Sequence, residues 1–90
     1  MDNQHKKIKG YRDLSQVEID LMNEAKELAE KCGEFCAKLE ETHALELEVT
    51  DNLEHRKELM DSILWYKKGK RDIQVGFMEV IRSVARPTTF

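Results

Sequence analysis

Two basic segments of the chain contain the residues whose chemistry could recognise a charged ligand. They are residues 5–12 (HKKIKGYR) and residues 67–71 (KKGKR). In the first segment the Tyr11 ring can stack on a nucleobase, and Gly10 permits a close approach of the backbone. Lys26 follows on a helical segment and can pair with a phosphate oxygen. A Tyr packed on the first helical turn and a solvated Lys are the simpler interpretation, so the anion site is a hypothesis at this stage.

The charge of the chain is divided by segment. Residues 1–12 contain four Lys or Arg and one acid, residues 13–63 contain five and fifteen, and residues 64–90 contain six and two, which gives the total of −3. Non-specific binding of nucleic acid requires many phosphate contacts on one continuous basic face, and the acidic middle interrupts such a face. The distribution favours a small anionic ligand at the basic ends over DNA or RNA. For residues 67–71, a solvated surface explains the cations as well as a site does.

One cluster of residues could hold a metal ion. Cys32 and Cys36 are one helical turn apart and His43 lies two turns further on, so all three can face one side of a helix. No second Cys/His pair completes a four-ligand site, and small core residues in a reducing compartment explain the spacing better. The sequence also lacks a Gly-rich phosphate loop before a helix, a nucleophile elbow and a nucleophile–base pair. We expect no metal, no cofactor and no enzymatic activity.

The apolar pattern predicts an all-α fold. We expect one domain, residues 1–90, in which a short N-terminal arm (1–14) precedes a long antiparallel helical hairpin. The first helix is predicted over residues 15–46, because Ser15 and Glu18 have the spacing of a capping box. One face of this helix carries small or apolar residues and a histidine at steps of three and four: Met22, Ala25, Ala29, Cys32, Cys36, Leu39 and His43.

The second helix is predicted over residues 51–86. Asp51 followed by Glu54 offers its N-cap, and Pro87 ends it. Its apolar face repeats at heptad spacing, with Lys70 as the single polar member: Leu59, Ile63, Tyr66, Ile73, Phe77, Val80 and Val84.

The position of the turn determines which residues of the two helices lie opposite each other. A turn near residues 47–50 would place Lys26 opposite residue 72, beside Lys70 and Arg71. The N-terminal arm with Gly10 and Tyr11 belongs to the open end of the same hairpin. Three stretches that are remote in sequence are therefore predicted to meet at one anion.

Both helices carry more apolar surface than a lone hairpin can bury. A chain of this length forms only a small core, so association with other protomers is the expected source of stability. The sequence has no apolar signal segment and no run of about 20 apolar residues. We expect a soluble, cytoplasmic oligomer that binds no membrane.

Both ends of the chain resemble a known family. The first motif is residues 5–15 (HKKIKGYRDLS), which continues to residues 18–19 (EI), 22–23 (MN) and Lys26. The second motif is IQVGFM, with RSVARPTTF at the C-terminus. In this order they resemble the phage anti-CBASS protein 2 family, whereas the middle of the chain is only generically similar.

This resemblance implies a compact helical-hairpin homohexamer that sequesters the cyclic oligonucleotide messengers of bacterial CBASS immunity without cleaving them. Cyclic dinucleotides such as cyclic GMP-AMP would bind between protomers, with Tyr11 against a base, Lys26 at the phosphates, and Gly10 and Arg12 beside them. The protein would act in the cytoplasm of the infected bacterium and would leave the CBASS effector inactive.

The family also implies separate pockets for cyclic trinucleotides. Gly69, Lys70 and Arg71 are the candidates for such a pocket, by their position and charge.

Two other functions stay open from the sequence. A helical assembly or adaptor protein would use its apolar stripes to bind a host or phage protein, and would bind no nucleotide. A small DNA- or RNA-binding regulator is suggested by the basic ends alone, and the net charge of −3 argues against it.

Overall fold

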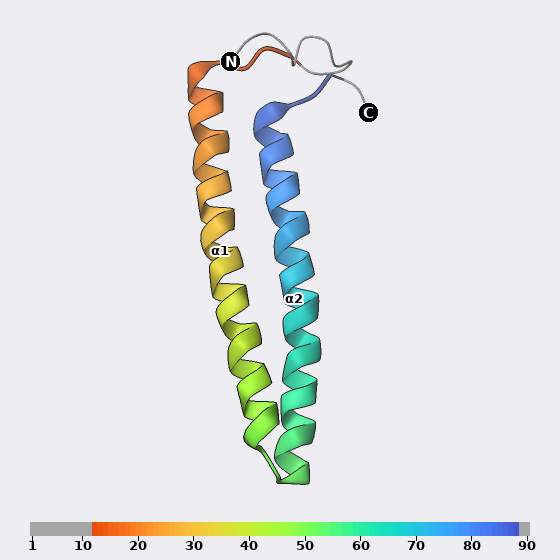
Figure 1. Ribbon diagram of the computed structural model, residues 1–90. Coiled ribbons are helices and arrows are strands. Elements are labelled where there is room, and N and C mark those ends of the chain that lie inside the picture. The colour runs from red at the N-terminus through yellow and green to blue at the C-terminus, as the bar shows by residue number, and fades with distance from the viewer. Residues whose placement is uncertain (1–11, 89–90) are drawn as a thin grey trace.

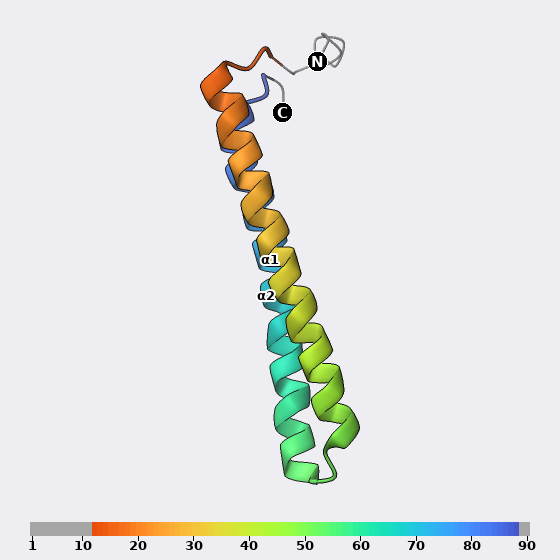
Figure 2. The same ribbon diagram turned by 60° about the vertical axis from the view of Figure 1, so that its left-hand side comes forward.

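A computed structural model describes residues 12–88 of the chain. Two long helices, α1 (Gln16–Val49) and α2 (Leu53–Ala85), run antiparallel and are joined by residues 50–52 (Figure 1). The helices stay adjacent from this connection to the open end, where α1 begins and α2 ends (Figures 1 and 2). The predicted all-α hairpin is confirmed. Neither helix has a stretch long and apolar enough to cross a membrane.

The start of α1 follows the predicted capping box. The Ser15 hydroxyl accepts a hydrogen bond from the Glu18 backbone N–H at 3.2 Å, and the Ser15 N–H donates to the Glu18 carboxylate at 2.8 Å. Two backbone N–H groups that lack helical partners are satisfied in this way.

The connection between the helices differs from the prediction. The first helix continues to Val49, because the strong helix formers around residues 44–48 carry it past the predicted end at residue 46. As a result the cap of α2 is not Asp51: the Asn52 side chain accepts from the His55 N–H at 3.0 Å. The Arg56 guanidinium donates to the Leu47 and Thr50 carbonyls at 2.8 and 3.3 Å, which satisfies acceptors at the end of α1.

The end of α2 is confirmed to lie just before Pro87. Arg86 caps the helix with φ 43°, a left-handed conformation in which its N–H donates to the Arg82 carbonyl at 2.8 Å. A non-glycine residue in this region is uncommon and requires other contacts to hold it. Those contacts are described below.

The face between the helices is narrow. The seven residues predicted for α1 all lie on its less exposed face, yet among the described residues only Cys36 (7% exposed) and Leu59 (6%) are buried. On α2 the predicted Ile73 and Val80 are exposed, so α2 keeps only part of its predicted face against α1. Large apolar side chains are exposed along both helices: Leu21, Leu28, Phe35, Leu45, Met60, Leu64, Trp65, Val75 and Met78.

Candidate functional site

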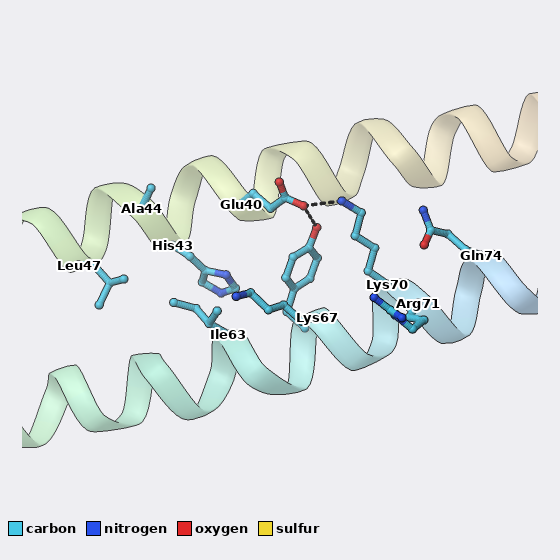
Figure 3. Close-up of a pocket in the computed structure, with 10 residues that line it drawn as sticks. Glu40, His43, Ala44, Leu47, Ile63, Lys67, Lys70, Arg71 and Gln74 are labelled. Atoms are coloured by element: carbon cyan, nitrogen blue, oxygen red, sulfur yellow. Dashed lines mark hydrogen bonds and ion pairs between the residues drawn. The ribbon is translucent and has the colours of Figure 1, made fainter.

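A groove lies midway along the hairpin, between the second half of α1 and the middle of α2 (Figure 3). Its volume is about 550 Å³, within the range of small-molecule pockets. The lining combines apolar and charged side chains from both helices: Glu40, His43, Ala44, Leu47, Ile63, Tyr66, Lys67, Lys70, Arg71 and Gln74.

Glu40 connects the two helices at this groove. Its carboxylate accepts a hydrogen bond from the Lys70 ammonium at 2.7 Å and a short one from the Tyr66 hydroxyl (Figure 3). The Tyr66 hydroxyl also lies 3.1 Å from the Cys36 carbonyl, so α1 offers it two acceptors. Tyr66 and Lys70 are one helical turn apart on α2, which is why both reach the same carboxylate.

These contacts determine the protonation states of Glu40, Tyr66 and Lys70. The hydrogen bond from Lys70 and then that from Tyr66 lower the pKa of Glu40, and Glu40 in turn raises the pKa of Lys70. Burial, followed by the hydrogen bond to Glu40, raises the pKa of the Tyr66 phenol far above its ordinary value. At neutral pH the groove therefore contains a carboxylate, an ammonium and a neutral phenol that acts as a donor.

His43 lies at the apolar side of the groove. Its ring meets that of Tyr66 edge to face, with centroids 5.8 Å apart. The Nδ1 atom of His43 is buried and has no hydrogen-bond partner among residues 12–88. The ring packs mainly as an aromatic surface in this arrangement.

The groove carries more positive than negative charge. Lys67, Lys70 and Arg71 line it together with a single carboxylate, that of Glu40. Within the described part of the chain, no ion pair is formed by Lys67 or Arg71. The arrangement can therefore bind an anion through Lys67 and Arg71, which form no ion pair among residues 12–88, although Lys67 is close enough to Glu40 to help lower the pKa of that carboxylate.

A second charged cluster joins the start of α1 to the end of α2 at the open end of the hairpin. The Glu18 carboxylate accepts from the Arg12 guanidinium at 2.5 and 3.2 Å and from the Arg86 guanidinium at 2.6 Å. We call these three residues the Arg12–Glu18–Arg86 clasp. The side chain of Glu18 is only 13% exposed, and the hydrogen bonds from Arg12, from the Ser15 backbone and from Arg86 hold its pKa well below the usual range.

Arg12 makes further contacts from the same guanidinium. Its Nε donates to the Arg86 carbonyl at 3.3 Å, its Nη2 to the Val84 carbonyl at 3.1 Å, and its Nη1 to the Asp13 carbonyl at 3.2 Å. Every nitrogen of the side chain therefore donates within the chain. The clasp ties the segment before α1 to the last turn of α2 and holds the left-handed Arg86 in place.

No protein-family model matches the chain. A comparison with known proteins finds Anti-CBASS protein 2 of Pseudomonas phage JBD67, which is 34% identical over 97% of this chain and 97% of its own length. The chain belongs to the anti-CBASS protein 2 family. The resemblance seen at both ends of the sequence is confirmed, and the relationship to anti-CBASS protein 2 spans both the groove and the clasp.

The site residues predicted from the anti-CBASS protein 2 resemblance are distributed over both regions. Lys70 and Arg71 line the groove, and Gly69 lies next to them without lining it. Arg12 belongs to the clasp. Gly10 and Tyr11 lie outside the described residues.

The turn predicted near residues 47–50 lies at residues 50–52 instead, and this changes the level of Lys26 on α2. The connection is centred on residue 51 rather than near residue 49, so Lys26 lies level with residue 76 of α2. Along the helix axis, residue 76 is about 9 Å from Lys70 and about 7.5 Å from Arg71. Lys26 does not line the groove. The meeting of Lys26 with Lys70 and Arg71 at one anion stays a prediction.

The clasp and Glu40 were missed by sequence reasoning. Glu18 has the spacing of a capping residue, and its second use by two arginines leaves no local signal. Cys32 and Cys36 are free thiols on the face of α1 that meets α2. Residues 12–88 contain no cluster of three or more His, Cys, Asp or Glu that could hold a metal ion.

Proposed function

We propose that this protein binds and sequesters cyclic oligonucleotide messengers without cleaving them, and thereby keeps CBASS immune effectors inactive. The observation that carries this proposal is the 34% identity, over nearly the whole of both chains, to a phage protein named Anti-CBASS protein 2. A sponge of this kind requires tight binding and no catalytic group. It acts where the messengers are made, in the cytoplasm of the infected bacterium.

The cyclic-dinucleotide site is assigned to Tyr11 and Lys26, with Gly10 beside them. A cyclic dinucleotide has two phosphates and two bases, so a symmetric interface can offer one Tyr and one Lys from each side. The exposed apolar side chains of both helices support such an interface, because a monomer rarely leaves so much apolar surface in water. The proposed assembly is the homohexamer implied by the family.

The groove is assigned to cyclic trinucleotides. Its excess of cations fits a ligand with three phosphodiester charges, and Lys67 and Arg71 form no ion pair with any of residues 12–88 that a ligand would have to break. Lys70 would have to exchange Glu40 for a phosphate oxygen, which places Glu40 in competition with the ligand.

Calorimetric titration with cyclic GMP-AMP tests the function. We expect saturable heat, and intact cyclic GMP-AMP in the chromatogram after the complex is denatured. Tyr11→Ala and Lys26→Ala should each weaken binding by about tenfold or more, with unchanged helix content and assembly size. Lys31→Ala, another exposed α1 lysine, is the matched control. Recovery of linear products would show an enzyme instead, and absence of heat with every cyclic dinucleotide and trinucleotide tried would reject the sponge.

A second candidate is a helical assembly or adaptor protein for a host or phage partner. The exposure of Trp65 (70%) and of Phe35 favours it, since aromatic side chains are enriched at protein interfaces. This function predicts a defined protein partner and no nucleotide binding, so the same titration separates the two.

A further inference from the structure

The groove at mid-hairpin changes in chemical character along its length. The part nearer the connection between the helices, which we call the apolar end, is lined by His43, Ala44, Leu47 and Ile63. The part nearer the open end of the hairpin, which we call the cationic end, is lined by Lys67, Lys70 and Arg71. Figure 3 shows the Lys67 side chain extending along the groove in the direction of the apolar end. The two ends are therefore parts of one continuous site.

The spacing of residues on α2 places both ends on one face of the helix. Ile63, Lys67 and Arg71 are each four residues apart, so they occupy successive turns of the same face. Each step is about 6 Å along the helix axis. On α1, His43 and Leu47 have the same spacing and line the apolar end from the other side. An apolar surface and two cations thus follow one another over about two helical turns.

A nucleotide contains the same groups in the same order. Its base has flat apolar faces, its phosphate carries the negative charge, and one sugar separates the two by a length comparable to one helical turn. Inorganic phosphate would use the cationic end alone, and a purely apolar molecule would use the apolar end alone. A ligand that joins an anion to a flat ring uses both.

We propose that the groove holds one nucleotide unit of its ligand, with the base against the apolar end and the phosphate between Lys67 and Arg71. This inference rests on the proposed function, which assigns a cyclic trinucleotide to the groove, and it adds which part of that ligand enters. The described lining has a single apolar end, so one base enters and the other two lie outside the groove. Lys70 is already held by Glu40 at 2.7 Å, which makes it the less available cation.

The apolar end is accessible to a base. Ala44 is exposed, and His43, Leu47 and Ile63 are half-buried, so a base would cover apolar surface that now faces water. Packing of a base against such side chains strengthens binding by about tenfold or more. Ala44 has the smallest side chain at this end, and a larger residue in its place would occupy the space that the base needs.

The substitution Ala44→Leu tests the apolar end without removing any charge. The probe is cyclic tri-AMP, a cyclic trinucleotide whose purine bases offer large flat faces. We expect calorimetry to show about tenfold weaker binding in Ala44→Leu than in wild type. Ala37→Leu makes the same change at an exposed position of α1 that does not line the groove, and it should leave the affinity unchanged. Helix content should be the same in both variants, because Leu is a strong helix former.

A pair of small ligands tests the base contact by its position. AMP and ribose 5-phosphate differ only in the presence of the base. In methyl NMR spectra, AMP should shift the signals of Ala44, Leu47 and Ile63 through the ring current of the base, and ribose 5-phosphate should not. Lys67→Ala should weaken the binding of both ligands, because both present a phosphate to the cationic end.

These measurements decide the inference. Support requires weaker binding of cyclic tri-AMP in Ala44→Leu alone, together with methyl shifts that depend on the base. Equal affinity in Ala44→Leu and wild type, an equal loss in Ala37→Leu, or AMP that leaves the three methyl signals unchanged overturns the inference and leaves the sponge intact. Wild-type protein that binds cyclic GMP-AMP but no cyclic trinucleotide overturns the assignment of the groove and this inference with it, whereas absence of binding to every cyclic nucleotide rejects the proposed function as well.

Discussion

The clasp at the open end and the groove at mid-hairpin are both built around one carboxylate of α1, yet they use it differently. Glu18 is 13% exposed and accepts from two guanidinium groups. Glu40 is 48% exposed and accepts from one ammonium and one phenol, beside Lys67 and Arg71, which lack ion-pair partners within the described chain. The first cluster is satisfied by the chain itself, whereas the second keeps positive charge available to a ligand.

This difference teaches which charged residues hold the structure and which can bind. A guanidinium whose N–H donors are all used within the chain would have to lose those hydrogen bonds before it could donate to a phosphate. A cation that lines a groove and forms no ion pair gives up only its bound water when it pairs with a phosphate. Density of positive charge in the sequence does not distinguish the two cases.

The largest expected effect concerns ligand binding at the groove. Lys67→Ala combined with Arg71→Ala should weaken binding of a cyclic trinucleotide by about a hundredfold, from about tenfold for each charge-assisted hydrogen bond. Thermal stability should stay nearly unchanged, because neither residue pairs with a described residue. Calorimetry measures the affinity, and Lys31→Ala with Lys57→Ala removes the same charge from exposed positions outside the groove. Equal losses in both double variants would mean that the groove has no special role.

The next effect concerns the clasp and stability. Arg12→Ala removes hydrogen bonds that join the start of α1 to the end of α2, and it leaves the Glu18 carboxylate with one guanidinium instead of two, so Tm should fall by about 5 °C or more. Lys68→Ala breaks the exposed Lys68–Asp72 pair at 2.9 Å and should change Tm by less than about 2 °C. Circular dichroism at one protomer concentration measures both. A Tm shift of less than about 2 °C in Arg12→Ala, as in Lys68→Ala, would show that the clasp contributes little to thermal stability.

Local sequence patterns predicted the helices well, because those signals lie within a few residues of the structure they determine. The capping box of Ser15 and Glu18 is one case, and the small-residue face of α1 is another. The cap of α2 was misassigned because Asp51 and Asn52 have almost equal capping tendencies, and only the observed end of α1 at Val49 decides between them.

The candidate site residues were also predicted where the signal is local in sequence. Lys70 and Arg71 are adjacent in sequence and line one groove. The position of Lys26 depended on the turn, and a shift of two residues there moved its level on α2 by four. Arg12 reaches carbonyls more than 70 residues away, an arrangement that depends on how the hairpin closes and leaves no periodic signal.

A smaller effect tests the opposite roles of the two carboxylates directly. Glu40→Gln removes the negative charge that competes with a ligand for Lys70, so cyclic-trinucleotide affinity should rise by about threefold. The gain is small because the ion pair is half-exposed. Glu18→Gln should not raise the affinity for either ligand class. Weaker trinucleotide binding in Glu40→Gln would instead make Glu40 an acceptor for the ligand, and the contrast between groove and clasp would fail at that residue.

The smallest effect is a difference in acid sensitivity. The folded protein lowers the pKa of Glu18 from its ordinary value of 4.5, mainly through the hydrogen bond from Arg12, and it lowers the pKa of Glu40 as well, mainly through Lys70. Below pH 4.5 the unfolded chain therefore binds more protons than the folded chain at these positions. Their contribution to stability is present above that pH and is lost as the pH falls toward the folded-state pKa.

Urea unfolding between about pH 6 and about pH 2.5, at one protomer concentration, measures this loss. Glu18→Gln should be less stable than wild type at pH 6 and should lose less free energy of unfolding as the solution is acidified. Glu40→Gln should show the same trend more weakly, because water and salt screen a half-exposed pair. Equal pH slopes in wild type and Glu18→Gln would mean that the clasp is not formed in solution. A steeper change for Glu40 than for Glu18 would reverse the comparison and make the groove, rather than the open end, the place where charge holds the hairpin together.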